Sequence, residues 1–265
     1  MNDLIWIPAS WVHQKKYNAV NVQSLDKNEG IAIAHNLGIQ WAREHHAKFV
    51  LLMDQDSIVA PDMVKQLLVV IRQKIAANLP VAAVGPRYMD KRQNNPPPFI
   101  SVKGLTLKRH ACTTKNSTVA VDYLISSGCL VPMSVFDIVG SMRDDLFIDY
   151  VDIEWGLRAQ HFGFQSFGVC AAHMQHDLGE QPVKFLGKNI PVHTPLRHYY
   201  HFRNAVALYK ESWVPLNWKL VDGRRLVLKY LFYSLFTKPR LAHFHMMSKG
   251  LWHAFTSNMG KLNID

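Results

Sequence analysis

Apolar runs and amphipathic segments alternate along the chain as far as residue 181. Residues 49–53 form an apolar run of strand length that ends in Asp54 and Asp56. Apolar side chains at three-to-four spacing predict helices over 30–46 and 61–78, on either side of this strand. The same reasoning predicts strands at 81–84, 119–125 and 164–170 and helices at 132–139, 155–162, 196–209 and 224–236. Strands alternating with helices indicate an α/β fold with a mostly parallel, Rossmann-like central sheet flanked by helices.

Two regions depart from this alternation. Residues 88–117 carry many charges and three consecutive prolines, a pattern typical of a binding or lid region, with one hairpin near 101–107. From residue 182 onward the chain becomes rich in aromatic and basic residues. We therefore expect a core over 1–181 and a helical, basic C-terminal region over 182–265.

The net positive charge of the chain comes from the C-terminal region alone. Residues 1–181 hold 17 Lys and Arg against 17 Asp and Glu, whereas residues 182–265 hold 13 against 3. Basic residues interleaved with aromatic ones favour an anionic membrane surface as the partner, and we expect no nucleic-acid partner. The longest apolar region, 226–236, is well short of the roughly 18 to 20 residues that span a bilayer. No signal peptide is evident, so we expect a peripheral location.

The cysteines predict neither a disulfide framework nor a zinc site. Cys112, Cys129 and Cys170 are odd in number and widely spaced. This usage favours a reducing cytoplasm, and hence the inner face of the cell membrane.

The first candidate for chemistry is the end of the 49–53 strand. Alternate residues of an extended chain face the same way, so Asp54 and Asp56 can address one ligand or one cation. Mg²⁺ and Mn²⁺ take such oxygen ligands together with substrate phosphates. The alternative is an ordinary solvated turn.

The second candidate is the acidic segment 147–154, which opens a predicted helix. A carboxylate at Asp152 or Glu154 could take a proton from an attacking hydroxyl. These acids could equally serve only the helix dipole, and Arg158 could simply pair with Glu154. His176 could complete a metal shell, or be an ordinary histidine.

The order of these segments resembles the family 2 glycosyltransferases of GT-A fold, and in particular bacterial rhamnosyltransferases of surface-polysaccharide (O-antigen) assembly. The resemblance runs from about Asn28 to the C-terminus and rests on the segments NEGIAIAHN, LLMDQDS, ISSGCLVP, LFIDYVDIEWGLR, HDLG and RHYYHFRN.

The resemblance implies an inverting, metal-dependent transfer of a sugar from a nucleotide diphosphate, dTDP-L-rhamnose, to a hydroxyl of a polyprenyl-diphosphate-linked acceptor. It implies Asp152 as general base and Mn²⁺ or Mg²⁺ as cofactor, and leaves a homo-oligomer open. By position it assigns Asn28, Gly30, Asn36 and Asp54 to the donor, Glu154, Ser127 and Gly128 to the acceptor, and Asp54, Asp56 and His176 to the metal.

The N-terminus departs from the family pattern. Members begin with a strand, a helix and a second strand that bind the nucleotide base, and residues 4–10 replace at best the second strand. We therefore expect a core that lacks the first strand and helix. The competing hypotheses are a non-catalytic remnant that serves as a membrane-bound assembly component, and a metal-dependent phosphohydrolase that uses the same carboxylates.

Overall fold

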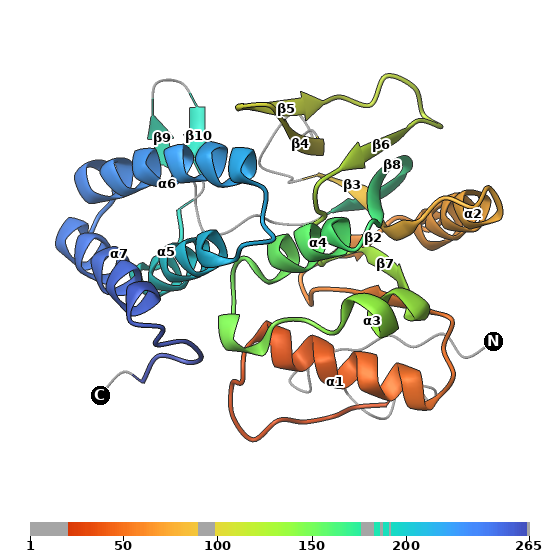
Figure 1. Ribbon diagram of the computed structural model, residues 1–265, viewed down its shortest axis with the longest axis horizontal. Coiled ribbons are helices and arrows are strands. Elements are labelled where there is room, and N and C mark those ends of the chain that lie inside the picture. The colour runs from red at the N-terminus through yellow and green to blue at the C-terminus, as the bar shows by residue number, and fades with distance from the viewer. Residues whose placement is uncertain (1–20, 90–98, 176–182, 186–187, 191, 264–265) are drawn as a thin grey trace.

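The computed structural model describes residues 21–89, 99–175, 183–185, 188–190 and 192–263, and the strand predicted near 4–10 lies outside these ranges. Helices and strands alternate through the first part of the chain, and three long helices follow (Figure 1). In chain order the elements are α1 (Ile31–Glu44), β1 (Phe49–Leu52), β2 (Ile58–Val59), α2 (Met63–Ala76), β3 (Val81–Met89), β4 (Phe99–Lys103), β5 (Thr106–His110), β6 (Thr118–Val121), β7 (Cys129–Pro132), α3 (Met133–Val139), the 3-10 turn η2 (Asp144–Leu146), α4 (Val151–His161), β8 (Gln165–Gln175), β9 (Val183–Phe185), β10 (Lys188–Ile190), α5 (Pro195–Lys210), α6 (Leu216–Phe236) and α7 (Arg240–Phe255).

The central sheet is mixed, so the prediction of a mostly parallel sheet was wrong in its strand directions. Its order is β1-β7-β3-β8-β2, with β6 also paired to β8. Within the described part of the chain, β3–β8 is the parallel pair, and the other pairs of this sheet are antiparallel. The difference arises because β7 lies between β1 and β3 and runs antiparallel to both, while β2 and β6 run antiparallel to β8.

Helices cover both faces of the sheet, and the short strand β7 shows how. Cys129 and Val131 pack into a core shared with α1, α3 and α4, whereas Leu130 between them packs against α2, β3 and β8. This alternation follows from the two-residue period of a strand. Because both faces of β7 are buried, its sequence is apolar throughout and ends at Pro132, where α3 begins.

The C-terminal helices form a second packed body beside the sheet (Figure 1). Helices α5, α6 and α7 share one apolar core, to which Tyr150 and Leu157 at the start and middle of α4 also belong. The predicted helix 224–236 is the second half of the longer α6, and α7 was not predicted. Of the helices that the structure describes, none has the length and apolar character needed to cross a bilayer.

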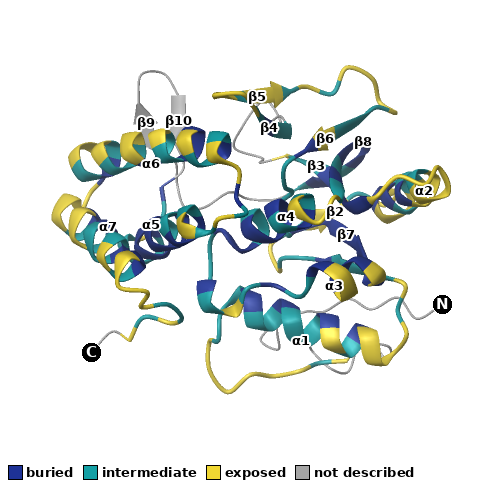
Figure 2. Ribbon diagram, in the orientation of Figure 1, coloured by how far each residue is buried: buried dark blue, intermediate teal, exposed yellow. Residues whose placement is uncertain are grey.

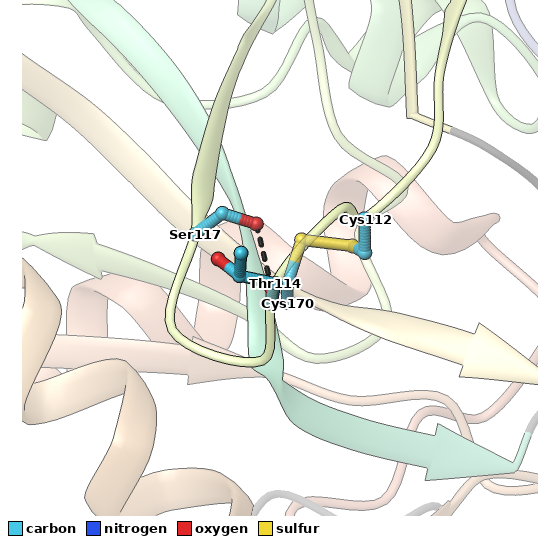
Figure 3. The surroundings of a disulfide bond; sticks show 4 residues. All are labelled: Cys112, Thr114, Ser117 and Cys170. Atoms are coloured by element: carbon cyan, nitrogen blue, oxygen red, sulfur yellow. Dashed lines mark hydrogen bonds between the residues drawn. A yellow bond between two sulfur atoms is a disulfide. The ribbon is translucent and has the colours of Figure 1, made fainter.

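A disulfide joins Cys112 to Cys170, although the number and spacing of the cysteines had indicated no disulfide framework (Figure 3). Cys112 follows β5 and Cys170 lies in β8, 58 residues further along the chain. The bond therefore fixes the irregular connection between β5 and β6 to the central sheet. The third cysteine, Cys129, is buried and unpaired in β7.

Candidate active site

The turn after β1 carries the first acidic motif, and the hydroxyl of a buried serine makes hydrogen bonds with this turn. The Oγ atom of Ser127 accepts a hydrogen bond from the Asp54 amide at 3.2 Å and lies 2.6 Å from the Ser57 hydroxyl. Ser127 is only 1% exposed, Asp54 is half-buried and Asp56 is exposed. The sequence placed Ser127 near the acceptor; the structure uses its hydroxyl to shape the turn that presents the two aspartates.

Position 128, the other position assigned to the acceptor, requires a glycine because of its backbone conformation and its close neighbours. Its φ is +79°, and a Cβ atom there would lie 2.6 Å from Pro86 and 3.2 Å from the Met174 sulfur. Its amide donates to the Leu52 carbonyl at 2.8 Å, at the end of β1. Gly128 thus joins β7 to the end of the strand that carries Asp54.

The second acidic motif begins in an unusual backbone segment. Phe147, Asp149 and Tyr150 all have left-handed φ angles, of 65°, 61° and 64°. A left-handed residue other than glycine costs roughly 1 to 2 kcal/mol, so surrounding contacts must hold this segment in place. It ends where α4 begins, and therefore sets the position of Asp152.

Two buried residues of α5 supply those contacts. The Asn204 side-chain amide donates to the carbonyls of Leu146, Ile148 and Asp149 at 2.7 to 2.9 Å. The Arg203 guanidinium donates to the carbonyls of residues 145, 146 and 260, and its Nε donates to the Asn204 Oδ1 at 2.9 Å. Both side chains are completely buried. Sequence reasoning did not assign them a role, although the polar pair inside the aromatic RHYYHFRN helix was a visible signal.

Asp152 combines partial burial with nearby negative charge. Burial raises the pKa of its carboxyl to about 6, and the charges of Asp149 and Asp54 act in the same direction, against the hydrogen bond from the Ile153 amide. Asp152 lines one small cavity together with Leu52, the last residue of β1, and Ser126, so the α4 carboxylate lies near the end of the strand that leads to Asp54. A carboxylate with a pKa this close to neutrality is suited to general base catalysis.

Glu154 is buried in the protein, which corrects its predicted contact with the acceptor. It is 2% exposed and makes two hydrogen bonds with Arg158, at 2.8 and 3.0 Å. Arg158 also donates to the carbonyls of Val139 and Ser141. The alternative in which Arg158 simply pairs with Glu154 is confirmed, and the pair fixes α4 to the end of α3.

The residues assigned to the donor near α1 also make structural contacts. The Asn36 side chain bonds both the amide and the carbonyl of Met142, at 2.8 and 2.9 Å, and also contacts Asp144. Asn28 accepts from the Gly30 amide, and a Cβ at Gly30 would collide with the Phe147 carbonyl. Asn36 and Gly30 thus meet the segment before α4, and Asn28 bonds within the turn before α1 and to Lys261. The contact of these three residues with a donor stays a prediction.

The metal ligands are only partly described. Asp54 and Asp56 lie on one turn and offer the oxygen donors that Mg²⁺ or Mn²⁺ prefers beside substrate phosphates. His176 lies outside the described residues. Inside them, no group of three or more His, Cys, Asp and Glu side chains is close enough to hold a metal ion. The predicted metal site therefore stays a prediction that two carboxylates of suitable chemistry support.

Comparison with known proteins decides the family. A family model described as glycosyl transferase family 2 matches residues 9–126. The chain is 34% identical over 231 residues to the dTDP-rhamnosyl transferase RfbF of Shigella flexneri, which covers 87% of this chain and 75% of that protein. The chain belongs to glycosyltransferase family 2. The family resemblance of the sequence motifs is thereby confirmed.

Solved structures confirm that this glycosyltransferase has a GT-A-like fold. A crystal structure of GalNAc-T7 with UDP, GalNAc and Mn²⁺ matches at a TM-score of 0.57 and 14% identity, covering 92% of this chain and 46% of that one. The structure of S. aureus TarS 1–349 in complex with UDP-GlcNAc matches at a TM-score of 0.54 and 13% identity, covering 91% and 67%. Identities this low show the fold alone, and this chain spans less than half of the first protein.

The hydrogen bonds of Asn204 to the backbone of residues 146–149 predict a large loss of stability in Asn204→Ala. Three carbonyls would lose a donor, and an unsatisfied buried polar group costs about 1 to 3 kcal/mol. We expect the free energy of unfolding to fall by about 3 kcal/mol in urea titrations. Asn217→Ala is the matched control, because that amide makes one long bond, 3.3 Å, to the Gly104 carbonyl; it should change stability by less than about 0.5 kcal/mol. Equal losses of unfolding free energy in the two variants would contradict this role of Asn204.

Proposed function

We propose that this glycosyltransferase moves L-rhamnose from dTDP-rhamnose to a hydroxyl of a lipid-linked oligosaccharide, with inversion at the anomeric carbon. The observation that carries the proposal is Asp152, a half-buried carboxyl with a raised pKa that lines one small cavity with Leu52, at the end of the strand before Asp54. The choice of sugar rests on the relative that is named a dTDP-rhamnosyl transferase. Its place in surface-polysaccharide (O-antigen) synthesis rests on the family resemblance.

In the proposed reaction the Asp152 carboxylate takes the proton of the acceptor hydroxyl as that oxygen attacks the anomeric carbon. The bond from the sugar to the diphosphate breaks on the opposite face, and dTDP leaves with the electron pair. A single displacement of this kind inverts the anomeric centre. Glu154 is unsuited to the same role, since both its oxygens bind Arg158.

Asp54 and Asp56, joined by His176, would hold the Mn²⁺ or Mg²⁺ ion. When bound, such an ion neutralises charge on the diphosphate. The contribution of the chain itself is the shape of the turn, which Ser127 and Ser57 fix from inside the protein.

We also propose that the C-terminal helices rest on the inner face of the cell membrane. Large apolar side chains are exposed along α7 at helical spacing, with Leu241 83%, Trp252 66% and Phe255 68% exposed. Two exposed basic residues, Lys238 and Arg240, lie at the N-terminal end of this helix. Apolar and basic residues together suit an anionic lipid surface. Because two cysteines are paired, the location now rests on these helices and on the nucleotide-sugar donor rather than on cysteine usage.

The sugar-transfer proposal predicts that Asp152→Asn separates binding from chemistry. Calorimetry with dTDP-rhamnose and Mn²⁺ should give similar affinities for this variant and the wild type, because Asn keeps the size of the side chain. Transfer to a lipid-linked acceptor should fall about 10²- to 10⁴-fold. Asp56→Asn is the complementary variant and should lose donor affinity. Failure of the wild type to bind the donor would reject the transferase proposal in favour of a non-catalytic role.

The membrane proposal predicts that a double Leu241→Ser, Trp252→Ser variant binds anionic vesicles more weakly. Burying each such side chain in the lipid interface contributes on the order of 1 to 2 kcal/mol, so partitioning should fall at least about tenfold. Co-sedimentation with phosphatidylglycerol vesicles measures it. The double variant Leu105→Ser, Ile138→Ser is the control, since these side chains are 61% and 56% exposed outside the C-terminal helices. Equal binding by both double variants would exclude this face of α7.

A further inference from the structure

A large cavity lies between α5 and α6, apart from the turn that carries Asp54. Its volume is about 710 Å³, within the range of pockets that hold small molecules. Asp149 lines it, three residues before Asp152, the α4 carboxylate that we propose as the base. The cavity therefore lies next to the acceptor side of the candidate active site.

One part of the cavity wall is polar and positively charged. Arg225 and Lys229 of α6 line it, and the Lys229 Nζ lies 2.9 Å from the His201 Nε2. Asp149 is the carboxylate in the wall, and Arg197 pairs with it at 3.3 Å. Arg225 lies 3.9 Å from Asp222, a carboxylate outside the cavity wall. Each arginine is thus matched by a carboxylate, and Lys229 is the cation that leaves the described part of the wall with a positive surplus.

His198, in the same wall, carries a buried nitrogen whose hydrogen bond is not satisfied. It is 1% exposed, and its Nδ1 lies 2.9 Å from the Nδ1 of His243. Its Nε2 is buried and has no hydrogen-bond partner among the residues that the structure describes. An unsatisfied buried nitrogen costs free energy, and its presence in a cavity wall points to a polar ligand.

The electrostatics of Lys229 indicate that this ligand is an anion. Burial lowers the pKa of its ammonium group to about 8, and the neighbouring Arg225 charge lowers it further, against the effect of Asp222 and Asp149. An anionic group placed between Lys229 and Arg225 would offset both burial and repulsion. Charge-assisted hydrogen bonds from lysine and arginine are well suited to phosphate.

The remaining wall is apolar and continues onto the molecular surface. Leu228, Leu231 and Phe236 line the cavity, yet they are 61%, 51% and 49% exposed. Exposed residues follow α6 and α7 along this part of the molecule (Figure 2). A ligand that filled the cavity would therefore meet charge at one end and a hydrocarbon surface at the other.

We propose that this cavity binds the phosphate end of a phosphate-bearing lipid, with the hydrocarbon chain leaving over Leu228, Leu231 and Phe236. Arg225, Lys229 and the Nε2 of His198 would bind the phosphate oxygens. This inference rests on the proposed function, in which the lipid carries the acceptor sugar. A sugar attached to such a phosphate would extend past Asp149 toward Asp152.

Calorimetric titration of the whole protein with farnesyl diphosphate tests this site. Farnesol and inorganic diphosphate are the comparison ligands, because each supplies only one end of the amphiphile. We expect farnesyl diphosphate to bind at least about tenfold more tightly than either. Inorganic diphosphate binding as tightly as farnesyl diphosphate would overturn a lipid site in favour of a free phosphate site.

Single substitutions on α6 locate the binding. Lys229→Met and Arg225→Gln should each weaken farnesyl diphosphate binding about tenfold, the loss expected for one charge-assisted contact. Arg224→Gln is the matched control, because this neighbouring arginine is exposed and does not line the cavity. Thermal unfolding of each variant checks folding. Wild-type affinity in both cavity variants would overturn the assignment.

Titration of the same variants with dTDP-rhamnose separates this inference from the proposed function. Donor binding should be unchanged in Lys229→Met and Arg225→Gln, since the Asp54 turn is unaltered. If the wild type binds the donor but not farnesyl diphosphate, the lipid site fails and the transferase proposal stands. If it binds farnesyl diphosphate but no donor, the proposed function fails instead.

Discussion

The hydrogen bonds from Arg203 and Asn204 to the backbone of residues 145–149 are the constraint on which the candidate site depends. They hold three left-handed residues just before α4, and so place Asp149 and Asp152. The donors are buried on α5, while the acceptors lie more than fifty residues earlier in the chain. The C-terminal helices are therefore part of the framework that holds the candidate site rather than an appendage to the core.

The same packed helices line the proposed lipid cavity and position the proposed base. Tyr150, the residue before α4, donates to Asp222 of α6 at 2.7 Å, and Tyr209 of α5 donates to the same carboxylate oxygen at 2.6 Å. The helix that carries the proposed lipid cavity is thus bonded to the segment that presents the proposed base. A lipid that docked between α5 and α6 would bring its sugar to a carboxylate whose position those same helices determine.

Local patterns in the sequence predicted much of the fold and the first acidic turn. The sequence reveals the apolar faces of α1, α2 and α5 because these faces follow from the spacing of residues close together in the chain. The same holds for the apolar run before Asp54. Contacts between distant segments were missed. Strand β7 is only four residues long. The four-residue spacing of Glu154 and Arg158 did indicate their ion pair, but the burial that raises the pKa of Asp152 depends on the fold. The Cys112–Cys170 bond and the contacts of Arg203 depend on the fold itself.

The central claim is that Asp152 accepts the proton of the acceptor hydroxyl, and the pH dependence of kcat/KM for sugar transfer tests it most directly. Because burial and neighbouring carboxylates raise the pKa of Asp152 to about 6, the base is protonated below that pH and ionised above it. The account predicts a rate that rises tenfold per pH unit below about pH 6 and levels off above it. A rate that stays constant from pH 5 to pH 8 would contradict it.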